Sequence, residues 1–291
     1  MSTIDTTPMA QSNDVTPALV AESREPMLRA ETLVKAQQFP AALQAINPFL
    51  KLHPTDRQCL YLKAVCHRYL QDVAQAIDAL STLLSAHPEY ARGYQELGHC
   101  YRIQAKFPEA INAYQMAVQL HPGLLASWQQ LANLFAAINE PALVREAQDK
   151  ITELKALSPL LMAAQSAFYE GRIAKAERLT RDFLIKQPSH IPAMRLLAKI
   201  AVKLNILEDA QILLSSAADM APHSTDLQLE LIQVLQKRQL FSQAHALAQT
   251  LFSSNPHLPL AELALANQCV AIGQTEQAIP HFDSVLAQLP S

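Results

Sequence analysis

Glycine is scarce in this chain, with five glycines among 291 residues. Enzymes that cradle nucleotide phosphates use glycine-rich loops, so the scarcity argues against a site of that kind. The four cysteines (Cys59, Cys66, Cys100 and Cys269) are too few and too scattered for a disulfide framework. The sequence also lacks a Gly-x-Ser-x-Gly elbow, a His-Glu-x-x-His motif and a Walker-type loop. We therefore expect no catalytic residues and no cofactor.

Charge and hydropathy exclude two further classes of partner. The formal net charge is -3, whereas nucleic-acid binding depends on clustered lysine and arginine. No segment approaches the roughly 20 apolar residues that a membrane span requires. Residues 1–22 lack the basic segment and the apolar run of a secretory signal, and we expect a disordered leader there. These features predict a cytoplasmic protein that contacts neither nucleic acid nor membrane.

Proline, in contrast, is plentiful and regularly placed. Pro54, Pro88 and Pro122 are spaced 34 residues apart, and a second series with the same spacing runs from Pro188 to Pro290. Each of these prolines marks a helix end, because its ring removes a backbone donor and clashes with the preceding turn. A fixed period of this size indicates one supersecondary unit stacked many times. The gap of 66 residues between the two series implies a block that has lost two residues.

Within each 34-residue block, large and small side chains recur three and four positions apart, which places them on one helical face. The block that begins at Ala91 predicts helices over 92–105 and 108–120, with Pro108 in the first turn of the second helix. One small residue of the first helix recurs as the point where helices approach most closely. In successive blocks this residue is Ala30, Ala64, Gly98, Ala132, Ala164, Ala198 and Ala266. One block has the larger Ile232 at the same position. The prediction is an all-α solenoid of about eight repeats over 23–291, irregular and shortened at 125–156.

The series Tyr94, Leu97, Gly98, Tyr101, Ala110, Tyr114, Ala117 and Pro122 resembles the tetratricopeptide repeat. This resemblance implies a right-handed superhelix whose first helices line a concave face that binds a protein or an extended peptide. The stretch that begins YARGYQELGHCYR is also similar to bacterial proteins in which such repeats precede a sulfotransferase domain. The phosphate-binding loop of that domain has no counterpart here, so no catalytic residue is carried over. The chain is then either a binding scaffold or the recruiting segment of a larger sulfotransferase.

By analogy with that family, the binding residues recur at fixed positions of the first helices. They are Arg92, Gln95, His99, Arg102, Gln129, Asn133, Gln165, Phe168, Tyr169, Arg195, Lys199, Lys203, Gln233 and Lys237. Arg195, Lys199 and Lys203 form a basic stripe at i, i+4 and i+8, although like charges at this spacing repel. The stripe is either a solvated helix face or a site for an acidic peptide anchored by Phe168 and Tyr169. The carboxylate clamp of chaperone-binding repeats does not fit, because Gln95 and His99 stand where lysine and asparagine belong.

Two other features have simple structural interpretations. Six histidines fall beside the block-ending prolines, a whole repeat apart, and we interpret them as solvated turn residues that form no metal site. Cys66 and Cys100 are one period apart and are interpreted as equivalent packing residues rather than a redox pair.

The end of the sequence predicts an uncapped repeat. Terminal repeats normally carry a polar cap, yet Phe282, Val285, Leu286 and Leu289 follow one another without a capping helix. These side chains are expected to be exposed or to meet another chain, and the sequence is expected to be a fragment or to self-associate.

Overall fold

The computed structural model describes residues 25–288, so the expected leader at 1–22 lies outside the described residues. The described chain is helical throughout and contains no strand. Its first eight helices are α2 (Glu25–Lys35), α3 (Phe39–Leu52), α4 (Arg57–Tyr69), α5 (Val73–Ala86), α6 (Ala91–Ile103), α7 (Phe107–Leu120), α8 (Leu125–Ala137) and α9 (Pro141–Ala156). The remaining eight are α10 (Pro159–Tyr169), α11 (Ile173–Lys186), α12 (Ile191–Lys203), α13 (Leu207–Met220), α14 (Thr225–Lys237), α15 (Phe241–Ser254), α16 (Pro259–Ala271) and α17 (Thr275–Gln288). The expected helix pairs are confirmed in every block.

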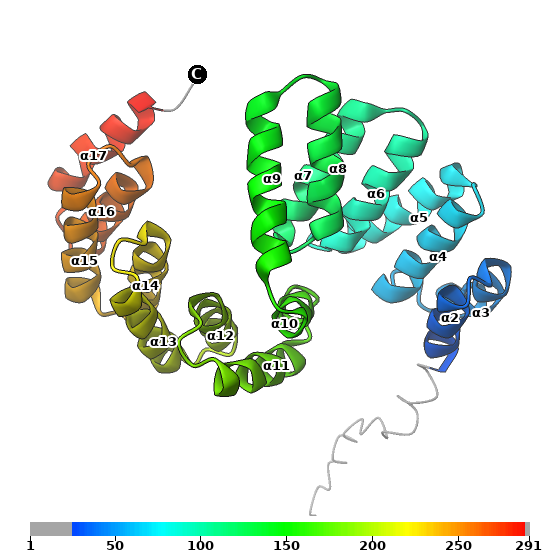
Figure 1. Ribbon diagram of the computed structural model, residues 1–291, viewed down its shortest axis with the longest axis horizontal. Coiled ribbons are helices and arrows are strands. Elements are labelled where there is room, and N and C mark those ends of the chain that lie inside the picture. Colours follow the sequence, from blue (N-terminus) through cyan, green and yellow to red (C-terminus); the bar gives the residue numbers. More distant parts are fainter. Residues whose placement is uncertain (1–24, 289–291) are drawn as a thin grey trace, which may run out of the picture. The chain divides into compact units, whose positions relative to one another are not determined.

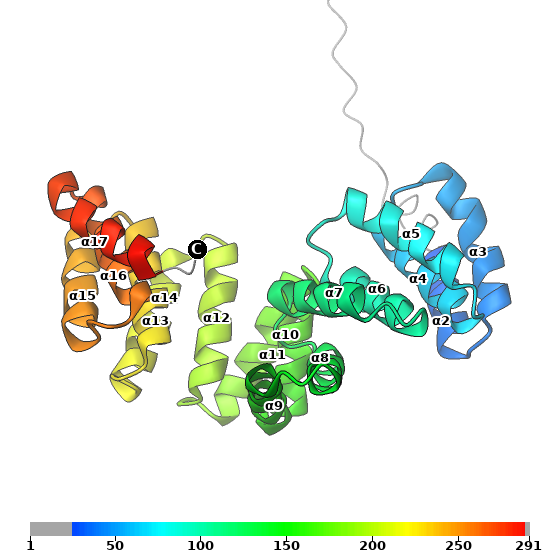
Figure 2. The ribbon, with the colours of Figure 1, turned by 90° about the horizontal axis from the view of Figure 1, so that it is seen from above.

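The chain divides into two compact units, and the boundary between Thr152 and Glu153 falls within α9. Unit 1 holds α2–α8 and most of α9, drawn in blue to green in Figure 1, and unit 2 holds α10–α17, drawn in green to red. In each unit the helices form hairpins, and the second helix of one hairpin packs against the first helix of the next. Figure 2 shows these pairs from above. None of the described helices combines the length and apolarity needed to cross a membrane.

The turn inside each hairpin uses one residue with a left-handed backbone. Gly171 (φ 78°) and Gly273 (φ 81°) occupy this place in two hairpins, while six other hairpins place Gln, Ala or Asn there. The backbone N–H of the following residue then donates to a carbonyl of the first helix, as from Arg172 to Ala167 at 2.8 Å. This hydrogen bond closes the helix end, as in a Schellman motif.

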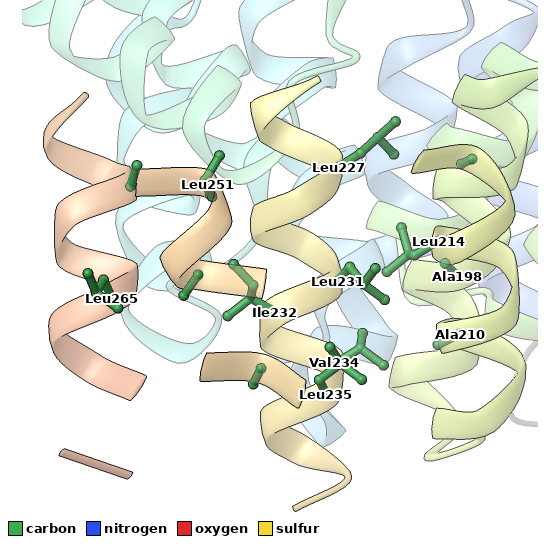
Figure 3. Packing of buried hydrophobic residues seen from close by; sticks show 14 of the residues in the cluster. Ala198, Ala210, Leu214, Leu227, Leu231, Ile232, Val234, Leu235, Leu251 and Leu265 are labelled. Carbon is green, nitrogen blue, oxygen red and sulfur yellow. The ribbon is translucent and has the colours of Figure 1, made fainter. Parts of the chain in front are cut away.

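Small side chains hold the hairpins together. All eight residues of the predicted close-approach series are buried, including the exception Ile232. Figure 3 shows the core of unit 2, where Ala198 of α12 and Leu214 of α13 face Leu231 and Val234 of α14. Buried alanines allow the helix backbones to approach, so the large side chains of the next helix can fill the space between them.

Gly98 illustrates why the small position matters. A Cβ atom on Gly98 would lie 2.7 Å from Cε1 of Tyr114, whose fully buried ring cannot move away. We expect Gly98→Ala to lower the free energy of unfolding by about 1 to 3 kcal/mol, because overpacking outweighs the gain in helix propensity. Gly93→Ala in the same helix is the matched control, since its Cβ would meet the flexible end of Leu84. Urea unfolding followed by the fluorescence of Trp128, the single tryptophan, reports on unit 1. Equal stabilities of the two variants would contradict this packing.

The fourth block is irregular because its second helix is longer than in other blocks, whereas the turn and the helix that follow are shorter. Helix α9 has 16 residues, whereas the second helices of other repeats, such as α7, have 14. The turn that follows is reduced to Leu157 and Ser158, and α10 has 11 residues instead of 13 as in α12. Helix α9 thus extends two residues beyond the length of its counterparts.

The last hairpin differs in part from the sequence prediction. Val285 is only 8% exposed, and Phe282 packs against the core cluster of unit 2, so neither side chain is left open. The prediction was wrong for these two residues because one face of α17 packs within its own unit. Leu286 and Ile279, on another face, are 64% and 57% exposed. Leu289 lies outside the described residues.

Candidate peptide-binding site

A pocket of about 390 Å³ lies in unit 2 along the first helices of three successive hairpins. Its lining comes from α10, α12 and α14, with one residue from α13. The lining residues are Phe168, Ala198, Lys199, Val202, Lys203, Leu214, Glu230, Gln233, Val234 and Lys237. The structure therefore brings together five residues that the sequence predicted: Phe168, Lys199, Lys203, Gln233 and Lys237.

The pocket has an apolar floor and a charged rim. Ala198, Leu214 and Val234 are at most 3% exposed and form the floor. Lys199 and Lys203 are one turn apart on α12 and are exposed on the rim. Because residues four apart share a helical face, the repeat pattern places both lysines on the side that faces the pocket.

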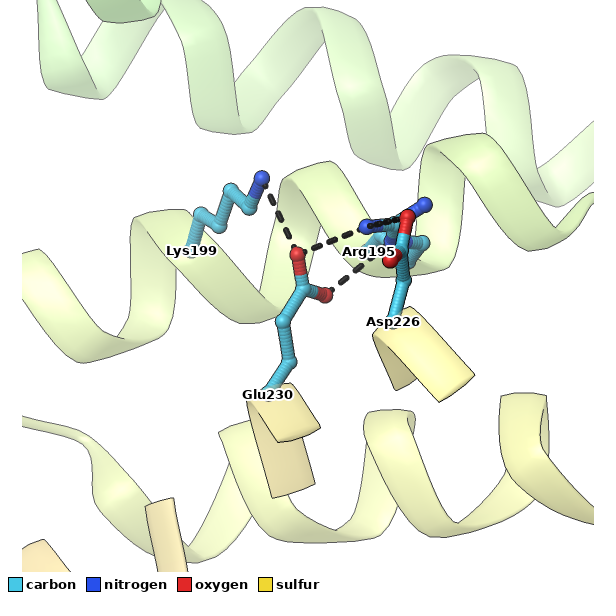
Figure 4. A network of polar contacts seen from close by, with 4 residues as sticks. All are labelled: Arg195, Lys199, Asp226 and Glu230. Carbon is cyan, nitrogen blue, oxygen red and sulfur yellow. Dashed lines mark hydrogen bonds and ion pairs between the residues drawn. The ribbon is translucent and has the colours of Figure 1, made fainter. Parts of the chain in front are cut away.

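Glu230 on α14 neutralises part of the predicted basic stripe (Figure 4). Its Oε1 accepts from Arg195 Nη2 at 2.8 Å and lies 3.1 Å from Lys199 Nζ, and its Oε2 accepts from Arg195 Nε at 3.0 Å. Asp226 lies 3.7 Å from the same guanidinium. Two members of the predicted basic stripe, Arg195 and Lys199, therefore face acidic side chains of the neighbouring helix, which the sequence prediction did not include.

The electrostatics of Glu230 follow from these contacts. Burial alone would raise the pKa of this carboxyl, but the Arg195 hydrogen bonds and the Lys199 charge outweigh burial and hold the pKa below its usual value. Glu230 thus remains ionised at neutral pH.

Lys203 and Lys237 differ from the other cations of the pocket. Lys203 ends α12 and Lys237 ends α14, and both side chains are exposed. Neither has an ion-pair partner among residues 25–288. A lysine in the last turn of a helix is favoured by the helix dipole, so each position is also compatible with the fold. Toward the N-terminal ends of α12 and α14, positive and negative charges are therefore balanced. The C-terminal ends of the two helices carry two positive charges without a partner among the described residues.

The two predicted aromatic anchors have different positions. Phe168 lines the pocket, whereas Tyr169 does not, although the two rings are in edge-to-face contact with centroids 5.2 Å apart. Burial raises the pKa of Tyr169, and the charges of Glu230 and Arg195 also act on it. Gln165, further back on α10, is half-buried and does not line the pocket.

Some of the predicted residues of unit 1 belong to a different polar cluster. His99 Nδ1 and the Tyr114 hydroxyl are hydrogen-bonded at 2.6 Å, and burial, with the charges of Arg68 and Arg102, lowers the pKa of His99 to about 4. Arg92 interacts with the Tyr61 hydroxyl. Arg92 and His99 are thus engaged in internal contacts. Gln129 and Asn133 on α8 are exposed, and Gln95 on α6 is half-buried.

Two ion pairs that cross between repeats were missed by the sequence reasoning. Arg68 Nε donates to Glu96 Oε2 at 2.6 Å, with both side chains largely buried, and Arg195 pairs with Glu230. Arg195 and Glu230 are 35 positions apart, one more than the repeat period. Opposite charges separated by about one period are the signal that could have revealed the second pair.

The turn histidines are more than solvated residues. His121 is 3% exposed and accepts the Gly123 N–H through Nδ1 at 3.1 Å. His87 Nε2 lies 2.8 Å from the Thr55 carbonyl oxygen of the preceding turn, and His190 Nδ1 accepts the Ala193 N–H at 3.3 Å. The prediction was wrong for these three because their rings bond the turn backbone, whereas His53, His223 and His257 are exposed as expected.

The cysteines are buried packing residues, as predicted. All four are free thiols in the interior. Burial raises the pKa of Cys66 and of Cys100 to about 11, which keeps both thiols protonated and weakly reactive at neutral pH. In the described part of the chain, no group of three or more His, Cys, Asp or Glu side chains could hold a metal ion.

Comparison with known families agrees with the helical hairpins. A family model described as the tetratricopeptide repeat matches residues 67–124 and 161–225. The described chain is an all-α solenoid of helical hairpins, and these two stretches resemble tetratricopeptide repeats. A second family model, described as subunit 3 of the anaphase-promoting complex, or cyclosome, matches residues 21–83. Neither matched family is a sulfotransferase, and the comparison with curated proteins gives no match.

The similar solved structures are distant from this chain in sequence. The Naa15/Naa10 complex bound to HypK-THB is 18% identical with a TM-score of 0.42, and the match covers 92% of this chain and 42% of that one. A tetratricopeptide repeat protein from Parabacteroides merdae is 13% identical with a TM-score of 0.42, covering 85% of this chain and 99% of that one. MamA from Desulfovibrio magneticus is 23% identical with a TM-score of 0.42, covering 46% of this chain and 75% of that one. This chain thus spans less than half of the Naa15/Naa10 chain that it matches.

Proposed function

We propose that unit 2 binds an extended, acidic segment of a partner protein in the pocket along α10, α12 and α14. Tetratricopeptide repeats are in general non-catalytic scaffolds that bind protein partners. One observation carries the proposal further: an apolar floor lies beside Lys203 and Lys237, two cations without an ion-pair partner in the described chain. An apolar side chain of the ligand fills the floor beside Phe168, and a neighbouring carboxylate lies between the two lysines.

The two parts of this site contribute differently to binding. Buried aromatic and aliphatic contacts supply most of the affinity at protein interfaces, whereas rim charges contribute little. Exposed charges mainly increase the association rate and select among partners. The apolar floor should therefore determine how tightly a segment binds, and the lysines should determine which segment binds.

Titration of labelled peptides tests the proposal. The probe is a fluorescein-labelled ten-residue peptide with one Leu-Asp pair in a Gly/Ser background, and a matched peptide carries Leu-Lys instead. We expect the acidic peptide alone to bind, and its affinity to fall about threefold to tenfold as added salt screens two exposed ion pairs. Fluorescence anisotropy at low and high salt gives both values. Selection of the basic peptide, or affinity that is indifferent to salt, would refute an acidic ligand.

A substitution in the apolar wall complements the salt series. Phe168→Ala should weaken binding more than Lys203→Gln does, because the ring supplies buried contact area. Phe107→Ala is the matched control, since Phe107 is 47% exposed on α7 and lies outside the pocket.

A further inference from the structure

We propose that Glu230 is an internal acidic ligand that limits the pocket to segments with a single carboxylate beside an apolar residue. The inference rests on the proposed function, and it assigns to Glu230 the role of a specificity-determining residue. It begins from the observation that part of the basic stripe is already occupied by a carboxylate of the protein itself.

The geometry of Glu230 is that of a bound carboxylate. Both of its oxygens accept from Arg195, at 2.8 and 3.0 Å, and Lys199 Nζ lies 3.1 Å from Oε1. Two parallel hydrogen bonds from one guanidinium form the bidentate arrangement by which arginine recognises a carboxylate. A carboxylate from a partner would have to displace this one to use the same donors.

The charges show what such a partner would encounter. Arg195 and Lys199 are paired with Asp226 and Glu230, as Figure 4 shows, and the charge of Glu153 also acts on Arg195, so this end of the pocket has no excess positive charge. A second acidic side chain placed here would face two carboxylates, and like charges juxtaposed at an interface are unfavourable. Only the end with Lys203 and Lys237 has positive charge left for a ligand.

The pocket is open enough for a ligand carboxylate to exchange with Glu230. Glu230 therefore selects among ligands rather than blocking the pocket. The side chains of Arg195, Lys199 and Glu230 are 30%, 45% and 21% exposed. Removal of the negative charge from Glu230 would therefore release Lys199 and the two donors of Arg195 that Glu230 occupies, while Asp226 stays 3.7 Å from the guanidinium. The cluster would then carry a positive charge that a ligand can reach, without a buried cavity being opened.

The helix spacing fixes the design of the probe peptides. Arg195 and Lys203 are eight residues apart on α12, which is about 12 Å along a helix. An extended peptide covers about 13 Å in four residues. A second Asp placed four residues from the first, on the amino-terminal side in one peptide and on the carboxyl-terminal side in another, can reach Arg195 in either direction of binding.

The experiment compares these two diacidic peptides with the single-Asp peptide, using the full chain and its Glu230→Gln variant. We expect wild-type protein to bind all three within about threefold, because the second Asp finds no net positive charge. Glu230→Gln should bind one diacidic peptide about tenfold or more tightly than the single-Asp peptide, because the second Asp can then pair with the donors that Glu230 occupies in the wild type. Glu208→Gln is the matched control, since Glu208 pairs with Arg238 outside the pocket.

A reciprocal variant separates this inference from a general effect of charge. Adding Arg195→Gln to Glu230→Gln should abolish the gain for the diacidic peptide while leaving the single-Asp affinity within about threefold. If wild-type protein binds the single-Asp peptide but Glu230→Gln shows no preference, or if wild type already prefers the diacidic peptide tenfold, Glu230 does not determine specificity and the proposed function stands. If wild type binds none of the acidic peptides, the proposed function fails and this inference fails with it.

Discussion

Replacement of Tyr114 with alanine is expected to lower the free energy of unfolding of unit 1 by about 3 to 5 kcal/mol, as for other buried aromatic side chains. The ring is fully buried, its hydroxyl bonds His99 Nδ1 at 2.6 Å, and its edge fills the space that Gly98 leaves open. The substitution creates a cavity and also leaves the half-buried His99 ring without its phenol partner. Urea unfolding followed by Trp128 fluorescence measures the loss.

Two further variants show that the loss arises from packing at this position. Tyr69→Ala removes the same atoms from a side chain that is 53% exposed, and its cost should be about 1 kcal/mol. Gly98→Ala should become neutral or stabilising in the Tyr114→Ala background, because the added methyl group enters the cavity. A loss below about 1 kcal/mol for Tyr114→Ala, or additive effects in the double variant, would contradict the contact.

The largest effect on binding is expected from reversing both uncompensated charges of the pocket. Lys203→Glu with Lys237→Glu should weaken binding of the single-Asp peptide about 30-fold or more, since two attractions become two repulsions worth about 1 kcal/mol each. The loss should shrink at high salt, because both positions are exposed to solvent. Anisotropy titration at two salt concentrations gives the values.

The control for this variant keeps the change in net charge and moves it away from the pocket. Lys175→Glu with Lys186→Glu places the same two reversals on α11, where both side chains are exposed. Its effect on affinity should stay below about threefold, because both positions are exposed to solvent, which screens their charges, and neither lines the pocket. Equal losses in the two double variants would mean that the peptide responds to the overall charge of the chain rather than to Lys203 and Lys237.

The helical repeats could be predicted because their signal is periodic. Each block-ending proline stops a helix by sterics alone, and the series of small residues follows from the close approach of neighbouring helices. Gly98 and Ala198 fell into that series without any knowledge of their contacts, and both are buried. The burial of Val285 was missed because the hydrophobic face of the last helix was assigned to an absent neighbour rather than to its own hairpin.

The site could be predicted only in part. Helical spacing places Lys199 and Lys203 on one face, and both line a pocket with Phe168. The role of Glu230 could not be read from the same helix, because it depends on which side chain of the next repeat reaches across to Arg195. Charge pairing between repeats is a property of two helices, whereas periodicity describes one helix at a time.

The most direct test of the central claim is zero-length coupling of the single-Asp peptide to the full chain. A carbodiimide joins a carboxylate to a lysine amine only when the two are in contact, and mass spectrometry of the digest identifies the lysine. Binding in the pocket of unit 2 predicts coupling at Lys203 and Lys237, with little at the equally exposed Lys175 and Lys186. Coupling distributed evenly over the exposed lysines, or concentrated in unit 1, would contradict the proposed site.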